Sequence, residues 1–260
     1  MNFSCPQEEL SFSYKQCIEI GIDTSITLPL VILNPEDLQK KVHKNKELIE
    51  AFHMSVEEEW VKGEYLFLLT DIEGYLMDVK CSTKGKKCIK DSGFERGISF
   101  REESCGTNAI SMAMRLKRVV YVRPQEHYCY IFKKWHCIAS PIIVENGEIV
   151  GYVDISTIDK KITSEVSMVI KLLAEKIASE YEKIVKEKEI NEIKIKLNDS
   201  QIKILELEAK GYRESDIAEA LGIGVVTVKY HKRKIVEKLG VKNTKEAVIK
   251  AIKLGLVDVD

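Results

Sequence analysis

Hydrophobic residues recur at steps of three and four through much of the first 60 residues, and this spacing predicts helices. One of these helices is expected to start at Asn34-Pro35, because proline is well tolerated at the first helical position. We expect the helices of residues 1–60 to pack against the domain that follows.

After Tyr65 the pattern changes to short runs rich in β-branched and aromatic residues. YLFLLTDIEGYLMDV predicts a hairpin with Gly74 in its turn, and CIASPIIVENGEIVGYVDIS predicts a second one, turned at Glu145-Asn146-Gly147. VVYVRP adds a strand, and TNAISMAMRLKR has the spacing of a helix. Residues 61–162 are therefore predicted to form an α+β domain with an antiparallel sheet.

Residues 163–196 have a helical pattern without glycine or proline. Apolar residues form a stripe along it, consisting of Val166, Ile170, Leu173, Ile177, Tyr181 and Ile184. The first half is typical of a helix that covers its own sheet. Past Ile184 the helix is expected to have outrun any core, so KEKEINEIKIK indicates either a solvated connector or a two-stranded coiled coil. The second alternative would make the protein a homodimer.

Residues 197–260 carry the signals of a helix-turn-helix. Asn198 with Gln201 three residues later is a variant of the capping box, and Gly211 is typical of a helix stop. Two further helices are predicted to cross through a tight turn, with small and apolar residues where a crossing requires them: Ala218, Gly222 and Val228.

The formal net charge of the chain is −1, so a surface that binds nucleic acid must be local. The helix predicted at Val225–Leu239 supplies such a surface through Lys229, Lys232, Arg233, Lys234 and Lys238. A charge run is usually a solvated face, but the helix-turn spacing before it favours a helix in a major groove. The core side of this helix is expected to consist of Val226, Val228, Ile235 and Leu239.

The segment from LNDSQ to VIKAI resembles the LuxR-type helix-turn-helix family, through the Gly211 stop, IAEALGI, TVK with His231, and KLGV. This resemblance implies that the helix near Thr227 enters the major groove of double-stranded DNA. By position, base contacts would come from Lys229, Tyr230 and Arg233, and phosphate contacts from Thr227, Lys232 and Lys210. The last helix, expected at Lys245–Leu254, is similar to one that pairs DNA-bound copies. The sequence departs from the family pattern at Gln201, Gly224 and Tyr230, so the resemblance does not predict which operator sequence the domain recognises.

Two blocks of the middle domain resemble the GAF-type sensor of the acetoin-catabolism activator group. They read EESCGTNAI and EHY followed by WHCIASPI, and the resemblance covers residues 11–185. It implies a pocket for a small-molecule effector, with these candidate residues: Glu102, Cys105, Thr107, Asn108, His127, Trp135 and Cys137. Asn108 and His127 are the expected polar anchors, unless the first only caps a helix and the second only ties a loop.

The activators of that group continue into an ATPase, but no G-x-x-x-x-G-K-[ST] motif occurs here. We therefore expect an output by DNA binding, with RNA polymerase recruited or blocked. No apolar stretch is long enough to span a membrane, and the first residues lack the pattern of a secretory signal. The protein is expected to be cytoplasmic, without a membrane partner.

Cysteine and histidine residues leave other sensing modes open. The seven cysteines all precede residue 138 and are expected to be reduced thiols. Four soft ligands lie close in sequence and could hold zinc or iron, although neighbours in a strand face opposite ways: His127, Cys129, His136 and Cys137. Cys81 and Cys88 flank STKGKK, an expected loop, and could form a redox switch or the site of a methionine sulfoxide reductase. We expect no enzyme, because a reductase has no use for a DNA-binding segment; the cofactor stays unknown.

Overall fold

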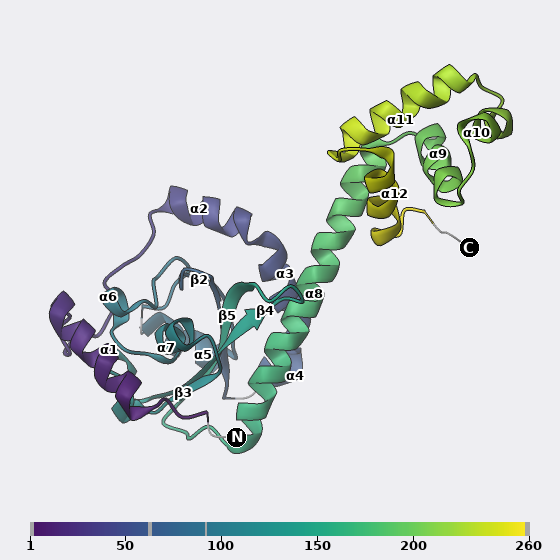
Figure 1. Cartoon of the computed structure of the whole chain (residues 1–260). Helices are drawn as coiled ribbons and strands as arrows, with labels where there is room; N and C mark the ends of the chain where they lie inside the picture. The colour runs from purple at the N-terminus through teal and green to yellow at the C-terminus, as the bar shows by residue number, and fades with distance from the viewer. Residues whose placement is uncertain (1–2, 62–63, 92, 258–260) are drawn as a thin grey trace. The chain divides into compact units, whose positions relative to one another are not determined.

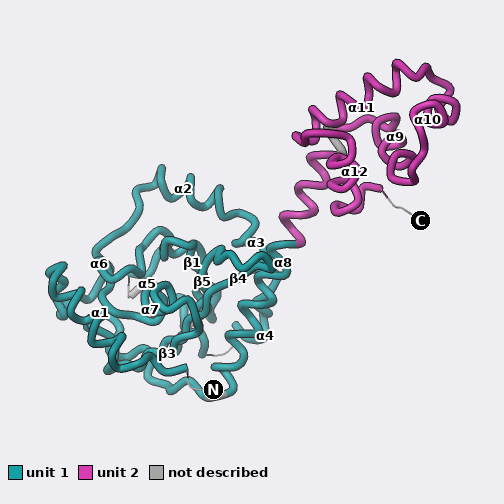
Figure 2. The backbone as a smooth tube through the Cα atoms, in the orientation of Figure 1, with its two compact units in different colours: residues 1–182 teal, residues 183–260 magenta. Residues whose placement is uncertain are grey.

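The computed structural model describes residues 3–61, 64–91 and 93–257, which fall into two units, residues 1–182 and residues 183–260 (Figure 2). Within the described residues, the first unit is built around a five-stranded antiparallel sheet of order β2-β1-β5-β4-β3 (Figure 1). Its strands are β1 (Leu66–Asp71), β2 (Leu76–Lys80), β3 (Val120–Val122), β4 (Trp135–Ile143) and β5 (Ile149–Ile158). The predicted α+β class is confirmed.

Helices precede, interrupt and follow this sheet. Those of the first unit are α1 (Gln7–Ile20), α2 (Pro35–Lys44), α3 (Lys46–Ser55), α4 (Glu58–Val61), α5 (Thr83–Asp91), α6 (Glu102–Cys105) and α7 (Ala109–Leu116). A long helix, α8 (Ser164–Lys196), contributes residues to both units. The second unit continues with α9 (Asp199–Ala209), α10 (Glu214–Leu221), α11 (Val225–Leu239) and α12 (Thr244–Lys253).

Both predicted hairpins are present, because their turns satisfy the backbone locally. At the β1–β2 turn, the Asp71 carboxylate accepts hydrogen bonds from the backbone N–H groups of Glu73 and Tyr75, at 3.0 and 2.9 Å. At the β4–β5 turn, the Asn146 side chain accepts one from the N–H of Glu148 at 2.9 Å. Gly147 has a φ of 86°, a left-handed conformation that favours glycine.

The two faces of the sheet are covered by different helices. Strand alternation and the register place six residues on one face: Leu66, Leu68, Cys137, Ala139, Asp154 and Ser156. The hydrophobic side chains of this face belong to one core with those of α1, α6 and α7. On the other face α3 approaches closely. A Cβ at Gly151 would lie 2.9 Å from Leu48 Cδ2 and 2.5 Å from the Thr70 carbonyl oxygen, so this position of β5 requires glycine.

Helix α2 begins where the sequence predicts, but one expected loop is a helix. Asn34 caps α2 by accepting a hydrogen bond from the N–H of Asp37, with Pro35 in the first turn. The segment STKGKK was expected to be a loop, whereas its residues from Thr83 onward belong to α5. Cys81 is buried before this helix; the side chain of Cys88 lies outside the described residues.

Helix α8 has buried residues near both of its ends, and the sequence predicted only the first group. In its first half Ile170, Leu173 and Ile177 are buried, as the apolar stripe predicts. The expectation that the helix outruns any core past Ile184 is wrong. Ile193 is buried in the core of the second unit, Ile190 packs against that core, and Glu189 forms an ion pair with Lys250 of α12 at 2.9 Å.

Local signals set the helix ends in the second unit. Asn198 and Gln201 form the predicted reciprocal capping box at the start of α9. Gly222 ends α10 with a φ of 64°, and α11 has the predicted bounds. Ile204 of α9, Ile217 of α10 and Val228 of α11 are fully buried, so these three helices share one core with α12.

Candidate DNA-binding surface and sensor cavity

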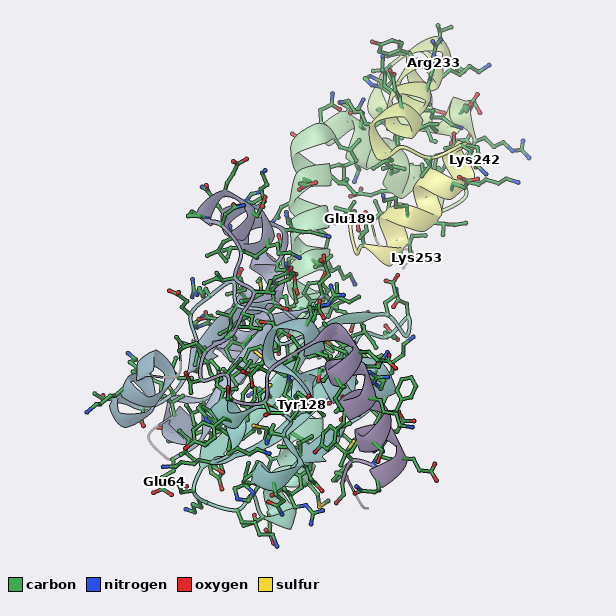
Figure 3. All side chains as sticks on the ribbon, turned by 90° about the vertical axis from the view of Figure 1, so that its left-hand side faces the viewer. Glu64, Tyr128, Glu189, Arg233, Lys242 and Lys253 are labelled. Atoms are coloured by element: carbon green, nitrogen blue, oxygen red, sulfur yellow. The ribbon has the colours of Figure 1, made fainter. Side chains whose placement is uncertain are left out.

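One side of α11 is exposed along its length. Val226, Lys229, Tyr230 and Arg233 occupy positions i, i+3, i+4 and i+7 and therefore form one stripe, which we call the α11 stripe. The exposed fractions are 80% for Val226, 57% for Tyr230 and 64% for the Lys229 side chain. Arg233 is exposed at the surface of its unit (Figure 3).

Val226 is a residue that the sequence analysis placed wrongly. It was expected in the core with Val228, but Val228 is fully buried and Val226 lies almost opposite on the helix, in solvent. An exposed apolar side chain in the first turn of a groove-binding helix is suited to contact a thymine methyl group. The signal was available: Val226 has the helical spacing of Lys229 and Arg233.

Lys232 lies apart from the α11 stripe. Its ammonium group is 2.6 Å from Glu208 of α9 and 3.0 Å from Glu214 of α10, and its side chain is only 17% exposed. Burial alone would lower the pKa of Lys232, but its hydrogen bonds with the two carboxylates outweigh this effect and raise it. Lys232 therefore ties three helices together.

Lys232→Ala is expected to destabilise the second unit by about 1–3 kcal/mol, because it leaves Glu208 without the cation that it contacts and Glu214 with Lys229 alone, 3.8 Å away. Lys234→Ala is the matched control. That lysine forms an exposed ion pair with Glu237 at 2.7 Å, and its loss should cost less than about 1 kcal/mol. Hydrogen exchange of the α9–α11 amides in the full chain measures both effects, and equal protection in the two variants would contradict this role.

The remaining predicted DNA contacts lie at the surface. Thr227 is exposed in the first turn of α11, and Lys210 is exposed at the C-cap of α9. Both positions are compatible with contacts to phosphates.

A small cavity lies in the first unit, on the sheet face that α7 covers. Its volume is about 10 Å³, room for about one water molecule. We call it the sensor cavity; it is lined by Leu68, Phe94, Phe100, Asn108, Ala109, Ile110, Phe132, Trp135, Cys137, Asp154 and Ser156. Aromatic rings form much of this wall, with Phe94 and Trp135 ring centroids 5.2 Å apart.

Asp154 is the most unusual residue of the sensor cavity. Its side chain is 1% exposed, the Ser156 hydroxyl donates to Oδ1, and Oδ2 has no hydrogen-bond partner among the described residues. Burial raises its pKa to about 8. At neutral pH Asp154 is therefore a neutral carboxylic acid that can donate a hydrogen bond.

His127 lies directly behind the aromatic wall. Its ring stacks on Phe132 with the centroids 5.1 Å apart, and it is completely buried. Burial lowers its pKa to about 3, so the ring is neutral. The nearby carbonyls of Arg123 and Pro124 oppose this effect, but neither ring nitrogen meets a described partner with hydrogen-bond geometry.

The predicted pocket residues do not all line the sensor cavity. Asn108, Trp135 and Cys137 line the sensor cavity. The Asn108 amide, however, donates to the carbonyls of Phe100 and Gly106 while its oxygen caps α7, so both of its N–H groups already have partners.

Two of the other predicted residues, Glu102 and Thr107, contact α1 instead. Ser13 donates to Glu102, and its hydroxyl lies 2.6 Å from that of Thr107. Cys105 is buried and donates to the Ser99 carbonyl.

The sequence analysis did not predict Asp154 and Ser156 as cavity residues. Two polar residues spaced by two within the apolar run GYVDIS are a detectable signal.

The metal-site alternative gains no support from the described residues, whereas the redox alternative at Cys81 and Cys88 stays a prediction, because the side chain of Cys88 lies outside them. Cys5, Cys105 and Cys129 are buried, and burial raises their pKa to about 12, so they are poor nucleophiles. Among the described residues no group of three His, Cys, Asp or Glu side chains is placed to hold a metal ion.

In the same part of the chain, no helix combines the length and the apolarity needed to cross a membrane.

The fold and the two surfaces define a class of protein: an α+β domain with a buried cavity, joined to a helix-turn-helix domain. The family model described as bacterial regulatory proteins, luxR family, matches residues 196–251, which confirms the LuxR-type resemblance. The model described as the MimR N-terminal domain matches residues 42–182, more than half of the chain. The chain therefore belongs to the family of the MimR N-terminal domain.

Curated relatives resemble parts of the chain. A signal-transduction and transcriptional-control protein of Clostridium beijerinckii is 28% identical over 57% of this chain and 24% of its own length. The acetoin dehydrogenase operon transcriptional activator AcoR of Bacillus subtilis is 32% identical over 36% of this chain and 15% of its own. The matches thus span a quarter or less of these relatives, and they confirm the resemblance to the acetoin activator group.

A solved structure shares the fold. The Escherichia coli DhaR(N)-DhaL complex contains a chain that superposes with a TM-score of 0.63 at 15% identity, over 70% of this chain and 63% of that one. At this identity the likeness concerns the fold alone.

Proposed function

We propose that this chain is a one-component transcriptional regulator, in which the second unit binds a specific DNA sequence and the first responds to a small molecule. The observation that carries this proposal is the exposed α11 stripe on a LuxR-type helix-turn-helix. The named relatives control transcription, which supports the same function. Such a protein acts in the cytoplasm, where the DNA that it binds is located. It acts by recruiting or blocking RNA polymerase rather than by catalysis.

In the proposed complex α11 lies in the major groove. Lys229 and Arg233 reach base edges because their long side chains are exposed one helical turn apart. Val226 contacts a thymine methyl group, and Tyr230 packs against a base or sugar beside it. Thr227 and Lys210 hold phosphates, while Lys232 braces the helix from behind.

Arg233→Ala tests this docking. Its effect should be selective because a base contact is removed. We expect a loss of about 1–3 kcal/mol in binding free energy on the preferred site and little loss on unrelated DNA. The preferred site is first selected from a random duplex pool with the wild-type protein, and affinities for selected and scrambled duplexes are then compared. Lys234→Ala is the control on the same helix. An unchanged sequence preference in Arg233→Ala would show that another face of α11 reads the bases.

We further propose that the regulator acts as a homodimer. Met168 and Leu172 of α8 are 67% and 64% exposed although they are large and apolar, and Ile249 of α12 is also exposed. Apolar residues spaced by four on one helix are suited to pair with a second copy. Two copies also fit the need of a helix-turn-helix for two half-sites.

A further inference from the structure

A second and larger hollow lies in the first unit, away from the sensor cavity. It is bounded by residues 117–119 after α7, the last residues of β4 and the first half of α8, with Phe3 in its wall. We call it the edge groove, because β4 is next to β3, the last strand of the sheet (Figure 1). Its volume is about 630 Å³, a size typical of small-molecule sites. It shares no lining residue with the sensor cavity.

The floor of the edge groove is the part of β4 that extends past β3. The described pairs of these two strands end at Ala139, whereas Ser140, Pro141 and Ile143 line the groove. Pro141 has no backbone N–H, and its carbonyl oxygen accepts a hydrogen bond from the Ser140 hydroxyl at 3.1 Å. An extended peptide therefore finds no backbone donor at Pro141, which disfavours addition of a strand. The floor is better suited to the apolar body of a small molecule.

The rim of the edge groove is positively charged. Three cations line it, Lys117, Arg118 and Lys171, together with one acid, Glu175. Lys171 and Glu175 are more than half exposed and 4.0 Å apart, so their ion pair is weak. In the part of the chain that the structure describes, no ion pair joins Lys117 or Arg118 to a carboxylate, and Arg118 donates to the Val119 carbonyl at 3.1 Å. Two cations thus lack a counter-charge beside an apolar floor.

Lys117 has a backbone conformation that glycine usually adopts. It follows α7 with a φ of 50°, whereas α1, α10 and α11 are followed in this conformation by Gly21, Gly222 and Gly240. A side chain at this position costs backbone energy. The helix dipole favours a cation near the end of α7, but a neighbouring position with right-handed backbone would supply one without that cost. The position of the Lys117 charge therefore points to a partner outside the helix.

We propose that the edge groove binds a small organic anion, whose carboxylate pairs with Lys117 and Arg118 and whose apolar body covers Val119 and Pro141. Hydrogen bonds between charged groups are stronger than those between neutral groups, and they orient the carboxylate. Removal of the apolar body from water adds affinity. This ligand site is distinct from the sensor cavity, and the inference does not depend on the proposed DNA-binding role.

Three naphthalene probes of similar size test the charge of the ligand: 2-naphthoate, 2-naphthalenemethanol and 2-naphthylmethylammonium. Isothermal titration calorimetry of the full chain at neutral pH and low salt measures the three affinities. 2-Naphthoate is expected to bind about tenfold more tightly than the alcohol, and the ammonium probe more weakly than either. Equal affinities would overturn the proposal, because apolar contact alone would then account for binding. Tightest binding of the ammonium probe would overturn it as well.

Charge variants locate the site. Lys117→Gln with Arg118→Gln should weaken 2-naphthoate about tenfold and leave the affinity for the alcohol unchanged. Lys44→Gln with Lys46→Gln is the matched control, because it removes two exposed cations of the same unit that do not line the groove. Glu175→Gln should strengthen 2-naphthoate about threefold, since it removes the acid of the rim. An equal loss in the two double variants would reduce the effect to net charge and overturn the site.

Lys117→Gly separates binding from folding. Glycine adopts a positive φ freely, so this variant should keep or raise the thermal midpoint of the first unit while it weakens 2-naphthoate about threefold. A lower midpoint with unchanged 2-naphthoate affinity would show that Lys117 has a structural role and would overturn its assignment.

Analytical ultracentrifugation distinguishes a ligand site from an interface between two copies of the chain. With an anion site, the Lys117→Gln/Arg118→Gln variant keeps the wild-type sedimentation and loses affinity for 2-naphthoate. A changed monomer–dimer equilibrium with wild-type affinity for 2-naphthoate would mean that a second copy covers the edge groove, and the proposal would be wrong.

Discussion

The first unit of the wild-type protein is expected to lose stability as pH rises from about 6.5 to 8, and Asp154→Asn should abolish that loss. The native pKa of Asp154, about 8, lies above its ordinary value of 3.8. The native protein therefore holds a proton that the unfolded chain has released, and each pH unit within this window lowers the free energy of unfolding by about 1.4 kcal/mol. The accumulated effect from pH 4 to pH 8 is on the order of 5 kcal/mol.

His127 opposes this trend at lower pH. Its native pKa, about 3, lies below the ordinary value of 6.5, so its contribution to stability grows as pH rises through that interval. Asp154 and His127 oppose each other between pH 4 and 6.5, and burial also lowers the pKa of His136, which adds to the contribution of His127. Above pH 6.5 the loss from Asp154 dominates, and the buried thiols add to it only as pH approaches 9. The Asp154→Asn variant should therefore gain stability up to pH 6.5 and then show a plateau.

Urea unfolding of the full chain at pH 5, 6.5 and 8 measures these profiles. Tryptophan fluorescence reports on the first unit alone, because Trp60 and Trp135 both belong to it. Thr70→Val serves as the control and should keep the wild-type profile, since it titrates nothing. Parallel profiles for wild type and Asp154→Asn would mean that the carboxyl group is ionised in the folded protein.

A fragment of residues 183–260 is expected to fold and yet bind the selected DNA site about 100- to 10,000-fold more weakly than the full chain. A single helix-turn-helix contacts one half-site, and a dimer converts the second contact into an intramolecular event. The fragment begins before α9 because Ile190 and Ile193 complete its core. A shorter fragment from residue 197 should be less stable, since it lacks both isoleucines.

Gel-shift titration on one duplex measures the affinities of fragment and full chain. The DNA affinity of the full-length Leu172→Glu variant should fall toward that of the fragment. A charge on the exposed face of α8 opposes pairing of two copies. Ile18→Glu on α1, which places the same charge at an equally exposed apolar position away from α8, is the matched control. Equal affinity of the fragment and the wild-type chain would argue against a dimer.

Sequence patterns predicted most of the fold, because local chemistry decides its turns and helix ends. The Asn146-Gly147 turn, the Asn198 capping box and the Gly222 stop each satisfy backbone groups within a few residues. Helix α5 was missed because its apolar contacts come from residues distant in sequence, among them the core around Ile89. Propensity alone favoured a loop there.

The candidate sites were predicted less completely for the same reason. The resemblance pointed to α11 and to the wall of the sensor cavity, but not to side-chain direction. Whether Lys232 faces DNA or two glutamates depends on how α9 and α10 pack, and sequence spacing does not contain that information. Strand alternation predicts that Asp154 faces the core, but it does not predict that a carboxyl group is tolerated there, which depends on residues of other strands and helices.

The ion pairs of Lys232 change how DNA affinity should respond to salt. Each cation that neutralises a phosphate releases condensed counterions and adds about −0.9 to the slope of log K against log salt. Lys232 and Lys234 already hold carboxylates, so they displace few ions from DNA. For α11 the slope should therefore reflect mainly Arg233 and Lys229, whose ammonium group lies 3.8 Å from Glu214 and is less closely paired than those of Lys232 and Lys234. Fewer cations then contribute than the helix carries, which leaves a larger share of the affinity to contacts that salt does not screen.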